Sequence, residues 1–298
     1  MRKLIKQTTK PRQPEVIIAG GGWAGIAAAV KLASAGIAVR MLESEKQLGR
    51  RTRCSKFGKL KVDNGQKIIF GYYHYILDLA RLIKQPRQKL FSKKPFRLAI
   101  TSTSRKGLYF RSKPLFAPWH MGLGIITASG ISWSEKQKIG SFWRAIKYAE
   151  NTQLEKLSVL DLLKESQQTE SLIKRFWEPS CLTLLNAPVE SASTLLFAKL
   201  INTLIKSREC SHLLFPKSDL NSLLTVPAIE FIENNGGMIS LNQTITRLHL
   251  NGNSTPSVST KKEKLECKEL ILALPYKTCA ALFQEHPALH QIPETGSA

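Results

Sequence analysis

The sequence predicts an α/β protein in which a parallel-sheet unit, assembled from segments distant in the chain, carries an inserted and mainly helical unit. Three patterns support this fold class. Residues 15–43 read as strand, turn, helix and strand, apolar side chains recur with a helical period between residues 132 and 206, and strand patterns return after residue 238. The 298 residues, 43% of them hydrophobic, suffice to bury one large core or two smaller ones.

The first strand, Val16 to Ala19, leads into a turn with three spaced glycines. Gly20, Gly22 and Gly25 form the pattern G-x-G-x-x-G. The first glycine permits a tight turn, the second lets the backbone approach a pyrophosphate, and the third lets the helix pack closely on the strand. The helix N-terminus then faces the phosphates, so this turn predicts a dinucleotide site.

Two further residues lie where a dinucleotide site requires them. Gly36 is placed to end the helix, and Glu43 ends the second strand, where a carboxylate can accept hydrogen bonds from ribose hydroxyls. The residues expected to hold the dinucleotide are therefore Gly20, Gly22, Trp23, Ala24, Gly25 and Glu43.

Helices account for most of the middle of the chain. Ser132 with Glu135 forms a capping box that opens a helix through about residue 150, and Ser158 with Asp161 resembles a second helix start. The periodicity of apolar residues predicts further helices over 170–186, 191–206 and 226–234, with strands near 238–250 and 269–274.

Basic residues concentrate in the first half of the chain. Residues 1–134 hold 26 Lys and Arg against 5 Asp and Glu, a net charge of +21, whereas residues 135–298 hold 18 against 17, a net charge of +1. Residues 81–113 carry eleven cations and no acid, and the 21 residues that follow, 114–134, carry no charge.

Several functions are compatible with this pair of segments. A dense basic patch permits nucleic-acid binding, but no nucleic-acid motif supports it. Pro114, Pro118 and nearby glycines disfavour a helix that spans a bilayer. Two interpretations remain open: contact with an anionic membrane surface, or a solvated loop followed by ordinary core.

Cysteine and histidine usage indicates a reducing compartment and no metal site. The five cysteines are widely spaced and form no C-x-x-C pair, which favours the cytoplasm. Among the six histidines, His286 and His290 are four apart, but Pro287 between them disfavours a shared helical face.

Four blocks of sequence resemble one family of flavoproteins. Residues 47–53, QLGRRTR, resemble the L-G-G-R-x-R segment of flavin amine oxidases and phytoene desaturases. Residues 62–66, VDNGQ, resemble the D-N-G-Q-H segment of the hydroxysqualene dehydroxylases, also called squalene-associated FAD-dependent desaturases. The blocks 176–193 and 214–220 are similar to later motifs of that family, so the resemblance covers about residues 15–283.

The resemblance implies a bacterial enzyme of hopanoid synthesis that uses reduced FAD to convert hydroxysqualene to squalene. It implies a discontinuous Rossmann-type FAD-binding domain, residues 1–75 and 213–298, with an inserted substrate domain, residues 76–212. By the same similarity Arg51 and Arg53 would reach the FAD pyrophosphate, and the Ile245 backbone would lie beside the adenine. A planar guanidinium matches phosphate oxygens well.

The sequence departs from this family at three places. Arg50 replaces the second glycine of G-G-R, which makes any positive φ there costly. Lys67 replaces the histidine of D-N-G-Q-H, which weakens an acid role for that position. Relatives continue beyond the strand at 269–274 with a segment that returns to the flavin, so we expect the FAD domain to lack its C-terminal part.

Candidates for the reaction itself are fewer. Asp63 is the candidate acid or polar anchor near the flavin, although a turn role for Asp63-Asn64-Gly65 fits as well. Tyr73, His74, Trp177 and Glu178 are candidates for the substrate pocket, and Trp177 fits a plain core position too.

Three alternatives to the dehydroxylase remain: an inactive flavoprotein remnant, a desaturase acting on carotenoid-like polyenes, and a basic module that binds lipid or nucleic acid. For the leading hypothesis we expect a cytoplasmic protein peripheral to the inner face of the membrane. Its surplus cations, with Lys93, Lys94 and Arg97 among them, would face anionic lipid at the mouth of an isoprenoid tunnel.

Overall fold

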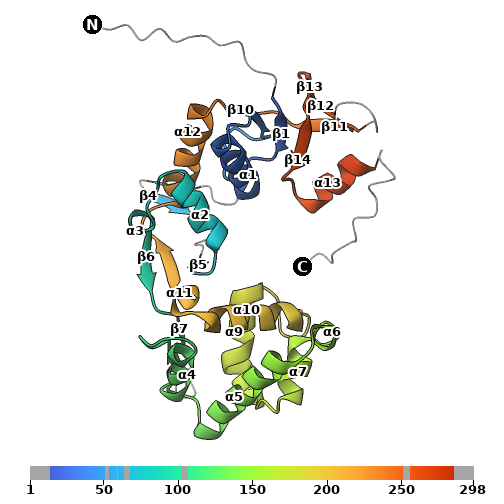
Figure 1. Ribbon diagram of the computed structural model, residues 1–298. Coiled ribbons are helices and arrows are strands. Elements are labelled where there is room, and N and C mark those ends of the chain that lie inside the picture. Colours follow the sequence, from blue (N-terminus) through green and yellow to red (C-terminus); the bar gives the residue numbers. More distant parts are fainter. Residues whose placement is uncertain are drawn as a thin grey trace, which may run out of the picture. The chain divides into compact units, whose positions relative to one another are not determined.

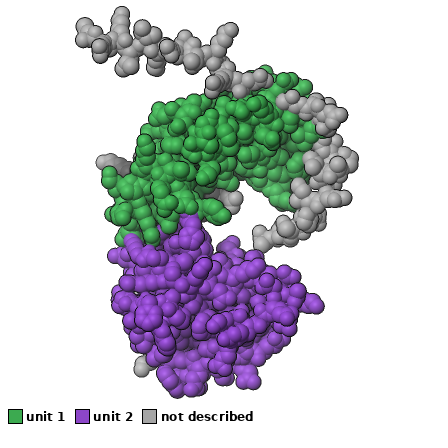
Figure 2. Space-filling view, viewed as in Figure 1, with its two compact units in different colours: residues 1–67, 75–92, 216–297 green, residues 68–74, 93–215, 298 purple. Residues whose placement is uncertain are grey.

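The protein divides into two compact units (Figures 1 and 2). The computed structural model describes residues 14–50, 54–58, 60–63, 68–101, 107–250 and 256–284. The sheet unit, green in Figure 2, draws on residues 1–67, 75–92 and 216–297, and the helical unit, purple in Figure 2, on residues 68–74 and 93–215.

A parallel sheet forms the centre of the sheet unit. Its strands lie in the order β10 (Met238–Ser240), β2 (Val39–Leu42), β1 (Val16–Ala19) and β14 (Glu269–Leu272). Val16 pairs with Val39 on one side and with Glu269 on the other. Because β1 is central, its side chains are buried on both faces, as its continuous apolar run indicates. The predicted α/β fold class is confirmed.

Helices and a smaller sheet complete this unit. Helix α1 (Trp23–Ser34) contacts β1, β2 and α12 (Val226–Asn234). The other elements are α2 (His74–Leu82), α3 (Arg87–Leu90), α13 (Tyr276–Phe283), the hairpin β3 (Cys54–Phe57) and β4 (Leu60–Asp63), and the antiparallel sheet β11 (Ile245–His249), β12 (Ser257–Thr260) and β13 (Lys264–Glu266). The predicted helix over 226–234 and the strands β10, β11 and β14 are confirmed.

The helical unit begins with short strands and continues as helices. Its strands are β5 (Ile69–Phe70), β7 (Arg97–Ile100) and β8 (Leu108–Arg111), together with most of β9 (Leu213–Pro216) and the second half of β6 (Phe91–Lys94). Its helices are α4 (Trp119–Ile126), α5 (Trp133–Tyr148), α6 (Asn151–Leu154), α7 (Val159–Glu165), α8 (Glu170–Leu172), α9 (Glu178–Leu185), α10 (Thr194–Lys206) and α11 (Arg208–Ser211). No helix in the described part of the chain is both long and apolar enough to cross a bilayer.

Both predicted capping boxes are present. Ser132 Oγ accepts from the Glu135 amide, and the Glu135 carboxylate accepts from the Ser132 amide at 2.9 Å. Ser158 and Asp161 make the same reciprocal pair at the start of α7. These bonds satisfy amide donors that a helix N-terminus otherwise leaves without a partner.

The predicted helix over 170–186 is interrupted. Residues Ile173–Trp177 form a π-helical turn between α8 and α9. The physical reason is Pro179 in the first turn of α9, which has no N–H to donate and whose ring would crowd the carbonyl four residues earlier. The same arrangement recurs in the sheet unit, where the π-helical turn Asn221–Thr225 precedes Pro227 in α12.

The boundaries between the units differ from the predicted 75/76 and 212/213. Residues 75–92 group with the sheet unit, where the Lys217 amide bonds the Leu90 carbonyl at 2.9 Å. Residues 68–74 and 213–215 group with the helices. The reason is that Phe70 and Leu213, paired between β5 and β9, pack on Leu204 of α10.

Candidate functional site

The glycine turn after β1 is closed by backbone contact. Gly20 has φ of +106°, and a Cβ on this residue would lie 2.5 Å from the Ala273 carbonyl oxygen. A Cβ on Gly25 would lie 1.9 Å from the carbonyl oxygen of Gly20. Both positions therefore require glycine for the fold of the turn itself, as the sequence pattern predicts.

Gly22 differs from both, because no described residue crowds it. A Cβ added there would meet no protein atom within 4 Å, so it would project into open space. Gly22 is the N-cap of α1, no side chain caps this end of the helix, and Trp23 and Ala24 form its first turn. The open space therefore lies at a helix terminus whose amides and dipole favour an anion such as a pyrophosphate.

Glu43 holds the turn as well as following β2. Its buried carboxylate accepts hydrogen bonds from the Gly21 amide at 2.7 Å, the Glu45 amide at 2.9 Å and the Ser44 hydroxyl at 3.1 Å. A Cβ on Gly21 would lie 2.8 Å from Glu43 Oε2, so this middle glycine is also constrained. Sequence reasoning missed Gly21, and its signal is the unbroken run of three glycines.

Two buried polar atoms near this turn have no hydrogen-bond partner among the described residues. One is the indole N–H of Trp23, and the other is the amide oxygen of Gln243, whose backbone N–H bonds the Glu43 carbonyl at 2.8 Å. Ile245, two residues further on, begins β11 and packs on the core below it. These two atoms are a donor and an acceptor that remain open to a ligand at the turn.

The segment after Glu43 lies against the glycine turn. The Gly49 amide donates to the Gly21 carbonyl at 2.8 Å, and Arg50 has φ of +27°. Arg50 thus occupies the backbone region that glycine favours, at a cost of about 1–3 kcal/mol. Arg51, Arg53 and Lys67 lie outside the described residues, as does the side chain of Asp63, whose backbone ends β4.

The helical unit contains an apolar cavity of about 490 Å³. This volume is within the range of about 300–1,000 Å³ typical of small-molecule sites. The lining comes from β5, β7, β8, β9, the helices α4, α5, α9 and α10, and the π-helical turn before α9. It includes Phe70, Leu98, Ile139, Phe176 and Leu204.

Three polar side chains in the lining donate hydrogen bonds to backbone carbonyls. Ser180 donates to the Phe176 carbonyl at 2.6 Å, Thr183 to the Pro179 carbonyl at 2.7 Å, and Lys136 Nζ to the Ile126 carbonyl at 2.7 Å. Arg97 is a charged member of the lining, and the rest of the cavity offers a ligand mostly hydrocarbon surface.

Of the four predicted pocket residues, one lines the cavity and three do not. Trp177 lines the cavity, and it also packs in the core with its ring 4.3 Å from that of Phe142, while its indole N–H bonds Gln168 at 3.0 Å. Tyr73, His74 and Glu178 are not among the residues that line this cavity. Tyr73 and His74 are exposed, and Glu178 is half-buried at the start of α9.

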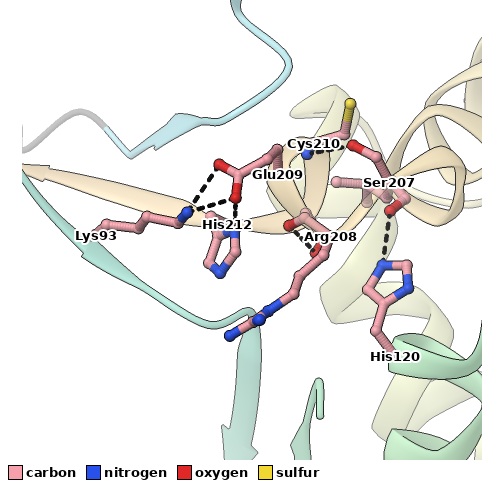
Figure 3. Close-up of polar contacts among 9 residues, drawn as sticks. Lys93, His120, Ser207, Arg208, Glu209, Cys210 and His212 are labelled. Atoms are coloured by element: carbon pink, nitrogen blue, oxygen red, sulfur yellow. Dashed lines mark hydrogen bonds and ion pairs between the residues drawn. The ribbon is translucent and has the colours of Figure 1, made fainter. Parts of the chain in front are cut away.

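A polar cluster lies beside the strands of the helical unit (Figure 3). Lys93 Nζ bonds both carboxylate oxygens of Glu209, at 2.6 and 2.8 Å. Glu209 thus gives Lys93 an acidic partner within the protein, and that Lys93 faces anionic lipid stays a prediction. In the same view His120 reaches toward α10, where its Nε2 is 3.3 Å from the Leu204 carbonyl, and burial lowers the pKa of its imidazole.

The sequence of this chain matches that of a known protein family. The model of flavin containing amine oxidoreductases matches residues 23–297. The chain belongs to that family. Hydroxysqualene dehydroxylase of Sinorhizobium fredii is 23% identical over 285 residues, which cover 90% of this chain and 63% of that protein. The 15-cis-phytoene desaturase of Solanum lycopersicum is 25% identical, covering 83% of this chain and 44% of that protein.

Solved structures agree on the fold. An oxidoreductase from Methanosarcina mazei superposes with a TM-score of 0.71 at 16% identity, covering 91% of this chain and 61% of that one. The chain thus spans about three fifths of the length of the hydroxysqualene dehydroxylase and of this structure.

FAD is the cofactor of this family, and the residues of the turn fit it. Gly22 leaves space at the N-terminus of α1 for a pyrophosphate, and the orphaned polar atoms of Trp23 and Gln243 offer a donor and an acceptor. The Gln243 amide donates to the Glu43 carbonyl, and this bond joins the segment that leads to Ile245 to the segment that follows β2. The family and the geometry therefore agree on an FAD-binding oxidoreductase fold.

Proposed function

We propose that this protein is an FAD-dependent oxidoreductase that removes the hydroxyl group of hydroxysqualene to give squalene. The observation that carries the proposal is the cavity of about 490 Å³, whose lining is hydrocarbon on nearly every side. An isoprenoid chain has the matching chemistry because it has no polar groups to desolvate along its length. The two relatives named hydroxysqualene dehydroxylase, each 23% identical, support the choice of substrate.

The chain's own residues supply binding and exclusion of water. Gly22 and the α1 N-terminus would hold the FAD pyrophosphate, and Glu43 keeps the turn in place through Gly21. When bound, reduced FAD supplies the hydride that replaces the hydroxyl group. The cavity walls, among them Phe176 and Leu204, would exclude water from an allylic carbon as it loses hydroxide.

A related desaturase acting on carotenoid-like polyenes is the second candidate. The match to 15-cis-phytoene desaturase favours it, and an apolar cavity suits either substrate. The two reactions differ in the direction of electron flow, since desaturation oxidises the hydrocarbon and dehydroxylation reduces the alcohol.

The experiment that tests the proposal is anaerobic incubation of the purified protein with FAD, dithionite and hydroxysqualene in detergent. We expect squalene, identified by mass spectrometry, and flavin bound at about one per chain. Bound flavin with turnover of phytoene but not of hydroxysqualene would support the desaturase. Failure to bind flavin or to turn over either substrate would contradict both assignments and leave the inactive remnant.

A further inference from the structure

An exposed apolar surface surrounds helix α4, and we call it the α4 surface. Trp119, Leu123 and Ile126 are spaced i, i+4 and i+7, so they lie on one face of α4, and their side chains are 57%, 36% and 46% exposed. Phe116, just before the helix, is 72% exposed, and Trp133, at the start of α5, is 62% exposed. Single exposed apolar residues are ordinary, but a group of five large ones marks an interaction site.

These residues are joined by contacts between their segments. Lys136 Nζ, in the first turn of α5, bonds the carbonyl of Ile126 at the end of α4, which brings the α5 start with Trp133 to the end of α4. At the other end, the His120 amide bonds the Phe116 carbonyl at 3.1 Å. The α4 surface is therefore one region of the helical unit rather than scattered positions.

Cations border the α4 surface. Arg97 and Arg111 lie opposite each other in the hairpin β7–β8, and α4 rests on that hairpin so closely that a Cβ on Gly124 would be 2.9 Å from the Arg111 carbonyl. The Lys113 amide bonds the His120 carbonyl at 2.8 Å. Like charges placed opposite each other in a hairpin are unfavourable unless an anion offsets them.

No described acid compensates these cations. The sequence has no Asp or Glu between Asp78 and Glu135, and Glu135 accepts bonds within the capping box of α5. Among the described residues, no ion pair involves Arg97, Arg111 or Lys113. An apolar face with a border of unneutralised cations complements a lipid surface that presents anionic headgroups above acyl chains.

The cavity reaches the α4 surface. Trp119 and Ile126 line the cavity while remaining about half exposed, and Arg97 of the cationic border also lines it. We propose that the α4 surface inserts into the interfacial layer of an anionic phospholipid bilayer, with the cavity mouth at the level of the acyl chains. Entry of an isoprenoid by this mouth rests on the proposed function, whereas the docking itself does not.

Vesicle sedimentation tests the docking. The full chain is mixed with vesicles of phosphatidylglycerol and phosphatidylcholine, or of phosphatidylcholine alone, and we expect at least about tenfold stronger binding to the anionic vesicles. The double variant Phe116→Ser/Leu123→Ser should weaken that binding about tenfold, because both side chains are exposed and neither lines the cavity. Leu196→Ser, an exposed leucine on α10, is the matched control and should bind as the unaltered protein does.

Substitutions of the bordering cations distinguish lipid from other anions. Arg111→Gln/Lys113→Gln should lower anionic-vesicle binding several-fold, whereas Arg144→Gln, on the distal part of α5, should not. The apolar contribution should persist at 0.5 M salt, where exposed charges are screened. Binding that disappears at that salt and is matched by duplex DNA would overturn the proposal in favour of nucleic acid.

Tryptophan fluorescence covers the case in which a variant does not fold. In the unaltered protein, brominated anionic lipid should quench emission, and Trp119→Phe/Trp133→Phe should remove most of that quenching. Absence of quenching, or vesicle binding unchanged by Phe116→Ser/Leu123→Ser, would overturn the proposal. So would a dimer in light scattering that the same double variant dissociates, since a second chain would then cover the α4 surface. Squalene formation from detergent-dispersed substrate reports on the proposed function separately.

Discussion

The glycine turn of the sheet unit and the cavity of the helical unit bind by opposite means. In the turn, backbone atoms make the site, and a single Cβ on Gly25 would lie 1.9 Å from another backbone oxygen. In the cavity, mostly apolar side chains make the site, and the hydroxyls of Ser180 and Thr183 donate to backbone carbonyls. Substitutions at the turn should therefore alter stability or FAD binding through backbone geometry, whereas substitutions at the cavity should act by changing its volume.

The largest expected effect is that of Gly25→Ala. The new Cβ cannot fit against the Gly20 carbonyl without moving α1 from β1, so we expect a loss of about 3 kcal/mol in the free energy of unfolding, together with loss of FAD binding. Urea denaturation and flavin titration measure the two quantities. Normal stability in this variant would contradict the close approach of helix and strand.

Gly22→Ala should separate ligand binding from folding. Its Cβ meets no protein atom within 4 Å, so the melting temperature should stay within a degree or two, while FAD affinity falls roughly 100-fold, about 2.7 kcal/mol. Flavin titration compared with thermal melting checks this. Lys31→Ala, at an exposed position near the other end of α1, is the control, and equal FAD affinity of Gly22→Ala and the unaltered protein would place the pyrophosphate elsewhere.

The free energy of unfolding should depend on pH through His120, which is buried against the Leu204 carbonyl. Burial lowers the pKa of His120 in the folded state, so the unfolded chain binds the proton more tightly. The contribution of a neutral His120 is therefore fully present above the unfolded value of about 6.5 and is lost as pH falls below it, by up to about 1.4 kcal/mol per pH unit.

Urea unfolding at pH 7.5 and 5.5 measures this loss. His120→Asn should reduce the difference between the two pH values, and His74→Gln, at an exposed position, should leave it unchanged. An equal pH dependence in the His120→Asn variant would show that other groups cause it.

The smallest expected effect on stability is at Gly140, which lines the cavity within α5. A Cβ there meets nothing within 4 Å, so Gly140→Ala should stabilise α5 by up to about 1 kcal/mol. Gly140→Leu should fill part of the cavity and raise KM for the isoprenoid at least several-fold. Thermal melting and steady-state kinetics check both, and an unchanged KM in Gly140→Leu would exclude the cavity as the substrate site.

Local signals allowed much of the fold to be predicted. Ser132 with Glu135 marked the start of α5, and the apolar run before Gly20 with the alanine-rich segment after it marked β1 and α1, because both depend on neighbours within a few residues. The π-helical turn before Pro179 was not predicted, since periodicity alone does not show how a helix accommodates a proline. The ion pair of Lys93 with Glu209 joins residues 116 apart, and no local pattern reveals it.

The spacing of Gly20, Gly22 and Gly25 was enough to predict the glycine turn, because these residues act through local backbone geometry. The sequence by itself also determined the charge asymmetry and the uncharged stretch over 114–134. Only the tertiary structure decided which side chains enclose the cavity, why Glu43 constrains Gly21, and that Trp119 and Ile126 belong at once to the cavity wall and to the exposed face. The physical reason is that a cavity and a surface are made by residues far apart in the chain, whose packing no local pattern encodes.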